Sequence, residues 1–153
     1  MLESPTKILM VCLGNICRSP LAQGILESMT HTKNVQVDSA GTGGWHQGEL
    51  PDHRSIKVAQ LNGIDISTQR ARQITLEDFT LFDRIYAMDA SNLNNLLKLA
   101  PNQDTNSKIT QILNPTTVGN WQDVPDPYYG NLSDFEYVFK LLQKACEKIA
   151  SDL

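Results

Sequence analysis

The stretch KILMVCLGNICRSPLAQG, residues 7–24, decides the fold of this chain. It opens with an uninterrupted apolar run (8–11), which is typical of a strand buried on both faces. Ser19-Pro20 then suits the start of a helix, and apolar residues recur at helical spacing after it, so we predict a helix over residues 19–29. The turn between strand and helix holds two of the three cysteines in the chain.

The rest of the sequence repeats this alternation of strands and helices. Further strands are predicted at residues 35–41, 83–88 and 107–113, and further helices at residues 52–63, 91–101 and 133–153, with a capping box from Thr75 to Asp78 and a proline-containing loop after residue 113. Such alternation predicts an α/β fold in which helices flank an open, twisted parallel sheet of about four strands. Ligands bind such sheets at the carboxyl ends of the strands, where the turn after residue 11 would lie.

Composition narrows the class of protein further. With 153 residues, 41% of them hydrophobic and 20% charged, the chain has the make-up of one soluble domain. A net charge of −4 argues against a nucleic-acid partner. We expect no membrane span and no signal peptide, because the chain lacks a long apolar stretch and an apolar N-terminal segment. Three cysteines fit the reducing cytoplasm better than a disulfide scaffold.

The turn before the first helix has the features of an anion site. Unpaired N–H groups and the helix dipole favour anions at a helix N-terminus. Gly14 and Asn15 most easily adopt the left-handed backbone angles of a loop that curls around a phosphate. Arg18 can pair with two phosphate oxygens at once. The same positive surroundings favour the thiolate form of Cys12, to which Ser19 could donate a hydrogen bond.

Other interpretations of this turn are weaker. A nucleotide-binding P-loop needs Gly-Lys-Ser or Gly-Lys-Thr at the helix start, and the sequence has neither. Two cysteines five residues apart do not make a zinc site, and the three histidines show no ligand spacing. Taken one at a time, these residues could also be structural: two cysteines packed in the interior and an arginine on the surface. The combination of cysteine, Gly-Asn and Arg-Ser in one turn favours a reactive site over this structural interpretation.

Residues 12–19, CLGNICRS, resemble the C-x5-R-S phosphate loop of the low-molecular-weight protein tyrosine phosphatases. The likeness continues in four further motifs: VDSAGT (37–42), ARQIT (71–75), MDASN (88–92) and DPYYGN (126–131). The resemblance implies that residues 1–153 form a single domain of this family. It also implies hydrolysis of phosphotyrosine in proteins, and of small aryl phosphates, through a cysteinyl-phosphate intermediate. No cofactor and no metal are expected.

The resemblance assigns three catalytic roles. Cys12 would be the nucleophile, Arg18 would bind the phosphate, and Asp126 would protonate the leaving oxygen. A phosphoester needs such an acid, and a carboxyl group on a separate loop can supply it. By itself, Asp126-Pro127 could be merely a turn.

The resemblance also implies the substrate-binding residues, which come from the phosphate loop and from two aromatic segments. These are Leu13, Gly14, Asn15, Ile16, Cys17, Ser19, Trp45, Tyr128 and Tyr129. Stacking on the aromatic side chains would favour aromatic phosphoesters. Trp45 could instead be a core or surface residue of its glycine-rich loop. Asn15, Ser19 and Ser39 are expected to hold the loop shape by hydrogen bonds.

For the residues around the loop, the sequence leaves more than one role open. Cys17 would lie near Cys12 and could trap an oxidised nucleophile as a disulfide, or it could be a small packed residue. Cys146 falls on the apolar stripe of the last helix, which indicates a core position. Asp89 suits a helix cap. Gln69 aligns with a histidine that many animal members of the family have, so the loop-supporting network could differ here.

Three other functions remain open on the same fold. An arsenate reductase needs further cysteines near residues 80–90, where this chain has none. A phosphoarginine phosphatase would carry threonine at the position of Ile16. A non-catalytic phosphate-binding module would lack the nucleophile or the acid. The partners we expect are phosphotyrosine-containing proteins, with the chain a monomer or weakly self-associating.

Overall fold

The computed structural model describes residues 3–153 and contains a parallel sheet within that range. Its strands are β1 (Thr6–Cys12), β2 (Val35–Gly41), β3 (Arg84–Ala87) and β4 (Ile109–Gln111). Their order in the sheet is β2-β1-β3-β4, and each neighbouring pair is parallel. The fold predicted from the sequence is therefore confirmed.

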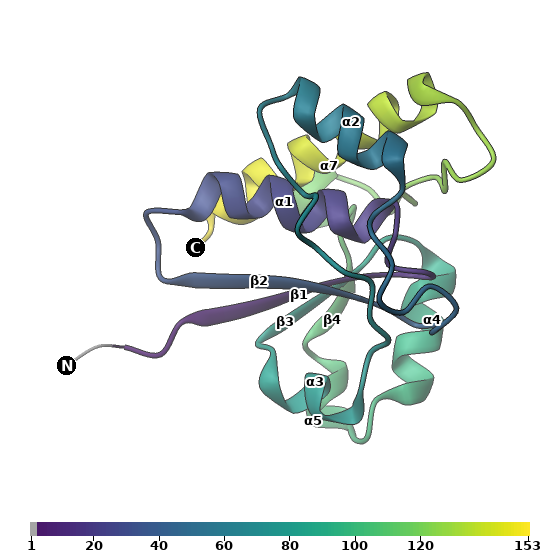
Figure 1. Ribbon diagram of the computed structural model, residues 1–153. Coiled ribbons are helices and arrows are strands. Elements are labelled where there is room, and N and C mark those ends of the chain that lie inside the picture. The colour runs from purple at the N-terminus through teal and green to yellow at the C-terminus, as the bar shows by residue number, and fades with distance from the viewer. Residues whose placement is uncertain (1–2) are drawn as a thin grey trace.

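Helices cover both faces of this sheet (Figure 1). On one side lie α1 (Arg18–Thr30), α2 (His53–Leu61) and α7 (Leu132–Ser151), with α2 packed on the other two. On the opposite side lie α3 (Leu76–Leu81), α4 (Ala90–Leu99) and α5 (Gln103–Asn106). A short helix, α6 (Pro115–Val118), follows β4.

Strand β1 lies between two hydrophobic cores, which explains its uninterrupted apolar run. Alternate side chains of a strand point to opposite faces. Ile8 and Met10 join the core beneath α1 and α7, whereas Leu9 and Val11 join the core beneath α3 and α4. All four side chains are fully buried.

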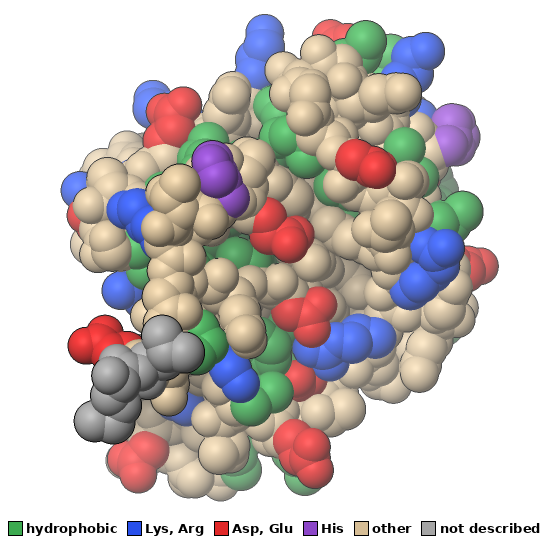
Figure 2. Space-filling view, turned by 60° about the vertical axis from the view of Figure 1, so that its left-hand side comes forward, with side chains coloured by type: hydrophobic (Ala, Val, Ile, Leu, Met, Phe, Trp, Pro, Cys, Tyr) green, Lys and Arg blue, Asp and Glu red, His purple; other side chains and the backbone are tan. Residues whose placement is uncertain are grey.

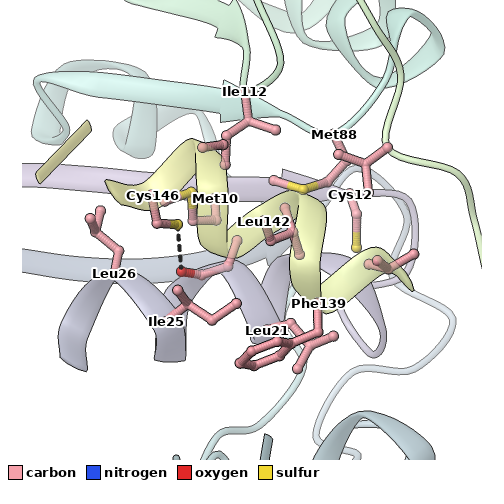
Figure 3. Close-up of a cluster of buried hydrophobic side chains, with 14 of the residues drawn as sticks. Met10, Cys12, Leu21, Ile25, Leu26, Met88, Ile112, Phe139, Leu142 and Cys146 are labelled. Atoms are coloured by element: carbon pink, nitrogen blue, oxygen red, sulfur yellow. Dashed lines mark hydrogen bonds between the residues drawn. The ribbon is translucent and has the colours of Figure 1, made fainter. Parts of the chain in front are cut away.

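Helix α7 contributes the apolar stripe that the sequence predicted. Its members Phe135, Val138, Phe139, Leu142, Cys146 and Ile149 are all buried. Figure 3 shows Leu142 and Cys146 facing Leu21 and Ile25 of α1. The thiol of Cys146 donates a hydrogen bond of 3.8 Å to the Ala22 carbonyl, and burial raises its pKa. Cys146 is therefore a core residue, as predicted.

Two short helices lie in segments for which the sequence predicted none. Helix α5 begins after Asn102, whose side chain accepts a hydrogen bond from the Thr105 N–H group. Helix α6 begins at Pro115, after the equivalent cap by Asn114, although the prolines here favoured a loop. Single-turn helices bury too little apolar surface to produce a periodic pattern in the sequence.

Close backbone contacts bring the loops after the strands together. The N–H groups of Thr42 and Gly43 donate to the carbonyl oxygens of Cys12 and Leu13 at 3.0 and 2.9 Å. A Cβ atom on Gly41 would lie 2.8 Å from the Leu13 carbonyl oxygen, so only glycine permits this approach. The loops after β1 and β2 consequently share one edge of the sheet.

Candidate active site

The sulfur of Cys12 lies at the carboxyl end of β1, almost completely buried. Its Sγ atom is 3.0 Å from Oγ of Ser19 and accepts a hydrogen bond of 3.3 Å from the Asn15 backbone N–H group. Cys12 also lines a pocket that opens to the surface. A thiol that is held by donors and reached from solvent is positioned for reaction with a bound molecule.

Asn15 supports the loop from behind. It has a φ of 58°, and no other non-glycine residue among residues 3–153 has a positive φ. Its side-chain nitrogen donates to Oγ of Ser19 at 2.8 Å and to Oγ of Ser39 at 2.9 Å, while its side-chain oxygen accepts from the Arg72 backbone N–H group at 3.0 Å. These contacts offset the cost of the left-handed backbone.

Gly14 differs from the sequence prediction, because its φ is not positive. The absence of a side chain matters there for space instead. A Cβ atom on Gly14 would lie 3.0 Å from Cδ2 of His46, which packs over the loop.

Arg18 begins helix α1, and its side chain is buried in the pocket floor. Nη1 donates to Oδ2 of Asp89 at 2.7 Å and to the Val124 carbonyl at 2.9 Å. Burial alone would lower the pKa of Arg18, but the negative groups of Cys12, Asp89 and Asp126 raise it above its ordinary value. The guanidinium therefore stays charged and fixed in orientation.

Asp89 has the supporting role that the sequence predicted. Its Oδ1 atom caps helix α4 by accepting from the Asn92 N–H group at 2.7 Å, and its Oδ2 atom accepts from Arg18. One carboxylate thus connects the helix after β3 to the arginine in the pocket.

Asp126 reaches the pocket from the loop before helix α7. Its Oδ2 atom is 3.7 Å from Nη2 of Arg18, and its side chain is 49% exposed. Its Oδ1 atom accepts from the Tyr128 N–H group at 3.1 Å, so Asp126-Pro127 also forms the turn that its sequence suggested. The carboxyl group therefore has access both to solvent and to a bound molecule.

Arg54 anchors this loop, and sequence reasoning missed it. Its guanidinium donates to the carbonyls of Gly130 and Tyr128 at 2.8 and 2.9 Å and pairs with Asp52 at 2.8 Å. It also lies over the Phe135 ring, 4.4 Å from the ring centroid. No local pattern around residue 54 could have revealed the two contacts with the loop, since Tyr128 and Gly130 lie 74 and 76 positions away in the chain.

The pocket itself has a volume of about 270 Å³. Its lining residues are Cys12, Leu13, Gly14, Ile16, Cys17, Arg18, Trp45, His46, Asp126, Tyr128 and Tyr129. The structure thus gathers nearly all residues named from the sequence, while Asn15 and Ser19 lie behind the loop. His46 was missed, although it directly follows Trp45 in the chain. Its side chain pairs with that of Glu49, three positions later in the chain.

Aromatic side chains surround the pocket mouth. Trp45 is 72% exposed and Tyr129 is 97% exposed, so Trp45 is not a core residue. The rings of Tyr128 and Tyr129 meet edge to face with centroids 5.0 Å apart. Exposed aromatic side chains at a pocket mouth can stack on a flat ligand.

Cys17 lies in the same pocket as Cys12, with both thiols free. Burial, the Asp52 carboxylate and the neighbouring Cys12 raise the pKa of Cys17. This shift favours the neutral thiol form of Cys17.

Gln69 does not take part in the Asn15 network. Its Nε2 atom donates to the Pro20 carbonyl at 3.1 Å, and its Oε1 atom is buried with no hydrogen-bond partner among residues 3–153. The network extends instead through Ser39, whose hydroxyl donates to Oε1 of Gln23 at 2.6 Å. The chain of polar contacts thus runs from Cys12 to the partly exposed Gln23.

The rest of the described surface offers less chemistry. A larger cavity of about 610 Å³ lies near the amino ends of β1 and β2, away from Cys12, between charged side chains such as Lys7, Glu27 and Lys33. On the side where the N-terminus lies, acidic, basic and histidine side chains are interspersed (Figure 2). Within residues 3–153, no three His, Cys, Asp or Glu side chains are grouped as a metal ion would require, and no helix could span a membrane.

Comparison with known proteins agrees with this geometry. The family model described as low molecular weight phosphotyrosine protein phosphatase matches residues 7–153. A human protein of that name is 40% identical over 151 residues, covering 95% of each chain. The crystal structure of YfkJ from Bacillus subtilis has a TM-score of 0.89 at 37% identity, covering 99% of this chain and 96% of that one. Wzb from Vibrio vulnificus, in complex with benzylphosphonate, has a TM-score of 0.85 at 29% identity, covering 97% and 99%. The chain belongs to the low molecular weight phosphotyrosine protein phosphatase family.

Proposed function

We propose that this protein hydrolyses phosphotyrosine in polypeptides through a phosphate ester of Cys12. One observation carries the proposal: Cys12, Arg18 and Asp126 line a single pocket, although they come from the end of a strand, the start of a helix and a distant loop. Together they supply a nucleophile, a fixed positive charge and a carboxyl group. The matched family and the relatives named as phosphatases support the same activity.

In the first step, the thiolate of Cys12 attacks phosphorus and the bond from phosphorus to the tyrosine oxygen breaks. The Ser19 hydroxyl and the Asn15 N–H group, at 3.0 and 3.3 Å, stabilise the sulfur as an anion before the attack. Arg18 holds the phosphoryl oxygens as charge develops on them. Because Asp89 and the Val124 carbonyl fix its guanidinium, little reorganisation is needed during the reaction.

Asp126 completes both steps as an acid and then as a base. It gives its proton to the departing phenolate oxygen, which leaves as tyrosine. It then accepts a proton from the water that attacks phosphorus, and the Cys12 thiolate leaves. The half-exposed position of Asp126 supports this role, because water can reach its carboxylate once the tyrosine has gone.

The pocket lining supports an aromatic leaving group. Ile16 is an apolar wall residue, and exposed aromatic side chains rim the mouth. Ile16 has no polar atom that could orient a guanidinium-linked phosphate. A relative bound to benzylphosphonate, whose phosphonate carries an aromatic ring, is consistent with the same preference. Polypeptides that contain phosphotyrosine are therefore the proposed substrates.

A redox function receives no support from the third cysteine. An arsenate reductase passes electrons through a series of thiols. Cys146 is fully buried beneath α1, and its thiol is bound to the Ala22 carbonyl (Figure 3), so it cannot reach Cys12 without unfolding.

Three matched peptides, carrying phosphotyrosine, phosphoarginine or phosphoserine at one position, test the proposal by their kcat/KM values. We expect phosphotyrosine to exceed both others by at least about tenfold, because only its ring can pack on Ile16 and the aromatic side chains of the pocket. Ile16→Thr should raise the relative rate on phosphoarginine, whereas Ile16→Val, which keeps the branched apolar shape, should not. Comparable rates on phosphoarginine and phosphotyrosine in the wild type would refute the assignment.

A further inference from the structure

A second cavity, of about 310 Å³, lies directly beside the catalytic pocket. It is lined by Leu13, Thr42, Gly43, Trp45, Asn95, Lys98 and Leu99. Leu13 and Trp45 line both cavities, so these two side chains form the partition between them. The loop after β2 provides one wall and helix α4 the other, at the right of the molecule in Figure 1.

Trp45 is held in place as that partition. A Cβ atom on Gly43 would lie 1.8 Å from Cζ3 of Trp45, so the indole rests directly on the glycine backbone. The other parts of the cavity are mostly apolar and accessible, since Leu13 and Leu99 are each 43% exposed. Lys98 is the one charged residue among those that line it.

We propose that this neighbouring cavity binds a large apolar side chain two positions from phosphotyrosine in the polypeptide substrate. The inference rests on the proposed function and adds a sequence preference to it. In an extended peptide, side chains two positions apart point to the same face and are spaced by roughly 6.6 Å. When phosphotyrosine enters the catalytic pocket, its second neighbour faces the same surface and can cross the Trp45 partition. The immediate neighbours point away.

Lys98 adds a charge preference. The chain as a whole carries a net charge of −4, which disfavours acidic peptides. The positive side chain of Lys98 offsets this locally. An acidic residue just beyond the bound apolar residue, on the side away from phosphotyrosine, should therefore be preferred over a basic one. Because Lys98 is exposed, this preference should weaken as ionic strength rises.

The test compares peptides with glycine around phosphotyrosine and leucine placed singly at positions −2, −1, +1 or +2. We expect leucine at −2 or +2 to raise kcat/KM by about fivefold, because half-burial of its side chain is favourable. Leucine at −1 and +1 should have no effect. Leu99→Ser should abolish the advantage, whereas Leu97→Ser should keep it. Leu97 lies on the same helix, is 38% exposed and does not line the cavity.

Charge reversal gives an independent measurement. On peptides with aspartate or lysine beyond the favoured leucine, the wild type should prefer aspartate by about two- to fivefold at low salt. Lys98→Glu should reverse this order, and Lys144→Glu, which makes the same change in net charge on α7, should not. Hydrolysis of phenyl phosphate, which is too small to cross the partition, measures catalysis alone in each variant.

The outcomes separate the two proposals. If no variant and no wild-type protein hydrolyses phenyl phosphate or any phosphotyrosine peptide, the proposed function itself is wrong. If hydrolysis is normal but leucine gives equal rates at all four positions, or its advantage survives Leu99→Ser, the cavity does not bind the substrate. Self-association in solution that Leu99→Ser abolishes, without any peptide preference, would assign the cavity to a second copy of the chain and overturn the inference.

Discussion

Oγ of Ser19 lies 3.0 Å from Sγ of Cys12 and also accepts a hydrogen bond of 2.8 Å from the Asn15 side chain. The side-chain oxygen of Asn15 accepts from the Arg72 N–H group, so its nitrogen must be the atom that faces Ser19. The hydroxyl proton of Ser19 is therefore free to point at the sulfur. The network thus directs a hydrogen-bond donor toward the sulfur of Cys12.

Ser19→Ala removes that donor and should lower kcat on phenyl phosphate by about tenfold to a hundredfold, the range for a hydrogen bond to a charged group. Stopped-flow or steady-state assays at saturating substrate would measure the loss. Ser28→Ala, on the same helix with its hydroxyl bound to the Ile25 carbonyl, is the control and should keep the wild-type kcat. Equal rates in both variants would show that the Ser19 hydroxyl does not assist the sulfur.

Asp126→Ala should lower kcat on phenyl phosphate by roughly 10²- to 10⁴-fold, the usual range for general acid catalysis. A series of aryl phosphates would show the loss shrinking as the leaving group becomes more acidic, because a good leaving group needs no proton. If the loss were the same for good and poor leaving groups, Asp126 would only shape its loop.

Arg54→Ala should release the loop that carries Asp126. The guanidinium bonds the carbonyls of Tyr128 and Gly130, so its removal misplaces the carboxyl group. We expect kcat to fall by about tenfold to a hundredfold on poor leaving groups, and by less on good ones. Arg70→Ala, which removes an exposed arginine bonded only to nearby carbonyls, is the control. A loss from Arg54→Ala that is independent of the leaving group would contradict this positioning role.

Peroxide should inactivate the enzyme and dithiothreitol should restore it, through a disulfide between Cys12 and Cys17. Because burial and Asp52 raise the pKa of Cys17, closure of the disulfide depends on a scarce thiolate. Its rate should therefore still be rising at a pH where an exposed thiol is already ionised. Cys17→Ser should make inactivation hard to reverse. Peptide mapping after mild oxidation that finds no bond between Cys12 and Cys17 would remove this role.

Much of the fold could be predicted from the sequence, because long helices and strands have clear periodic patterns of apolar residues. The apolar run of β1 and the stripe of α7 each arise from burial, which dictates residue type position by position. The single-turn helices α5 and α6 bury little and were missed. Strand β4 has only three residues, so the strand predicted at residues 107–113 was too long.

The residues of the candidate site also fall into those that the sequence could predict and those that it could not. The loop from Cys12 to Ser19 is one continuous motif, so its residues could be named together. His46 and Arg54 act through contacts between distant segments, and no local pattern encodes those contacts. The cavity beside Trp45 likewise exists only because helix α4 packs next to the loop after β2.

The central claim is that Cys12 becomes phosphorylated during turnover. Rapid mixing with a phosphotyrosine peptide, quenching within one turnover and mass spectrometry of the digested protein would test it directly. We expect a transient phosphate on the peptide that contains Cys12, formed as fast as tyrosine is released, and absent in Cys12→Ser, which should still bind vanadate. Tyrosine release without any phosphorylated protein, or phosphate on a residue other than Cys12, would contradict the account.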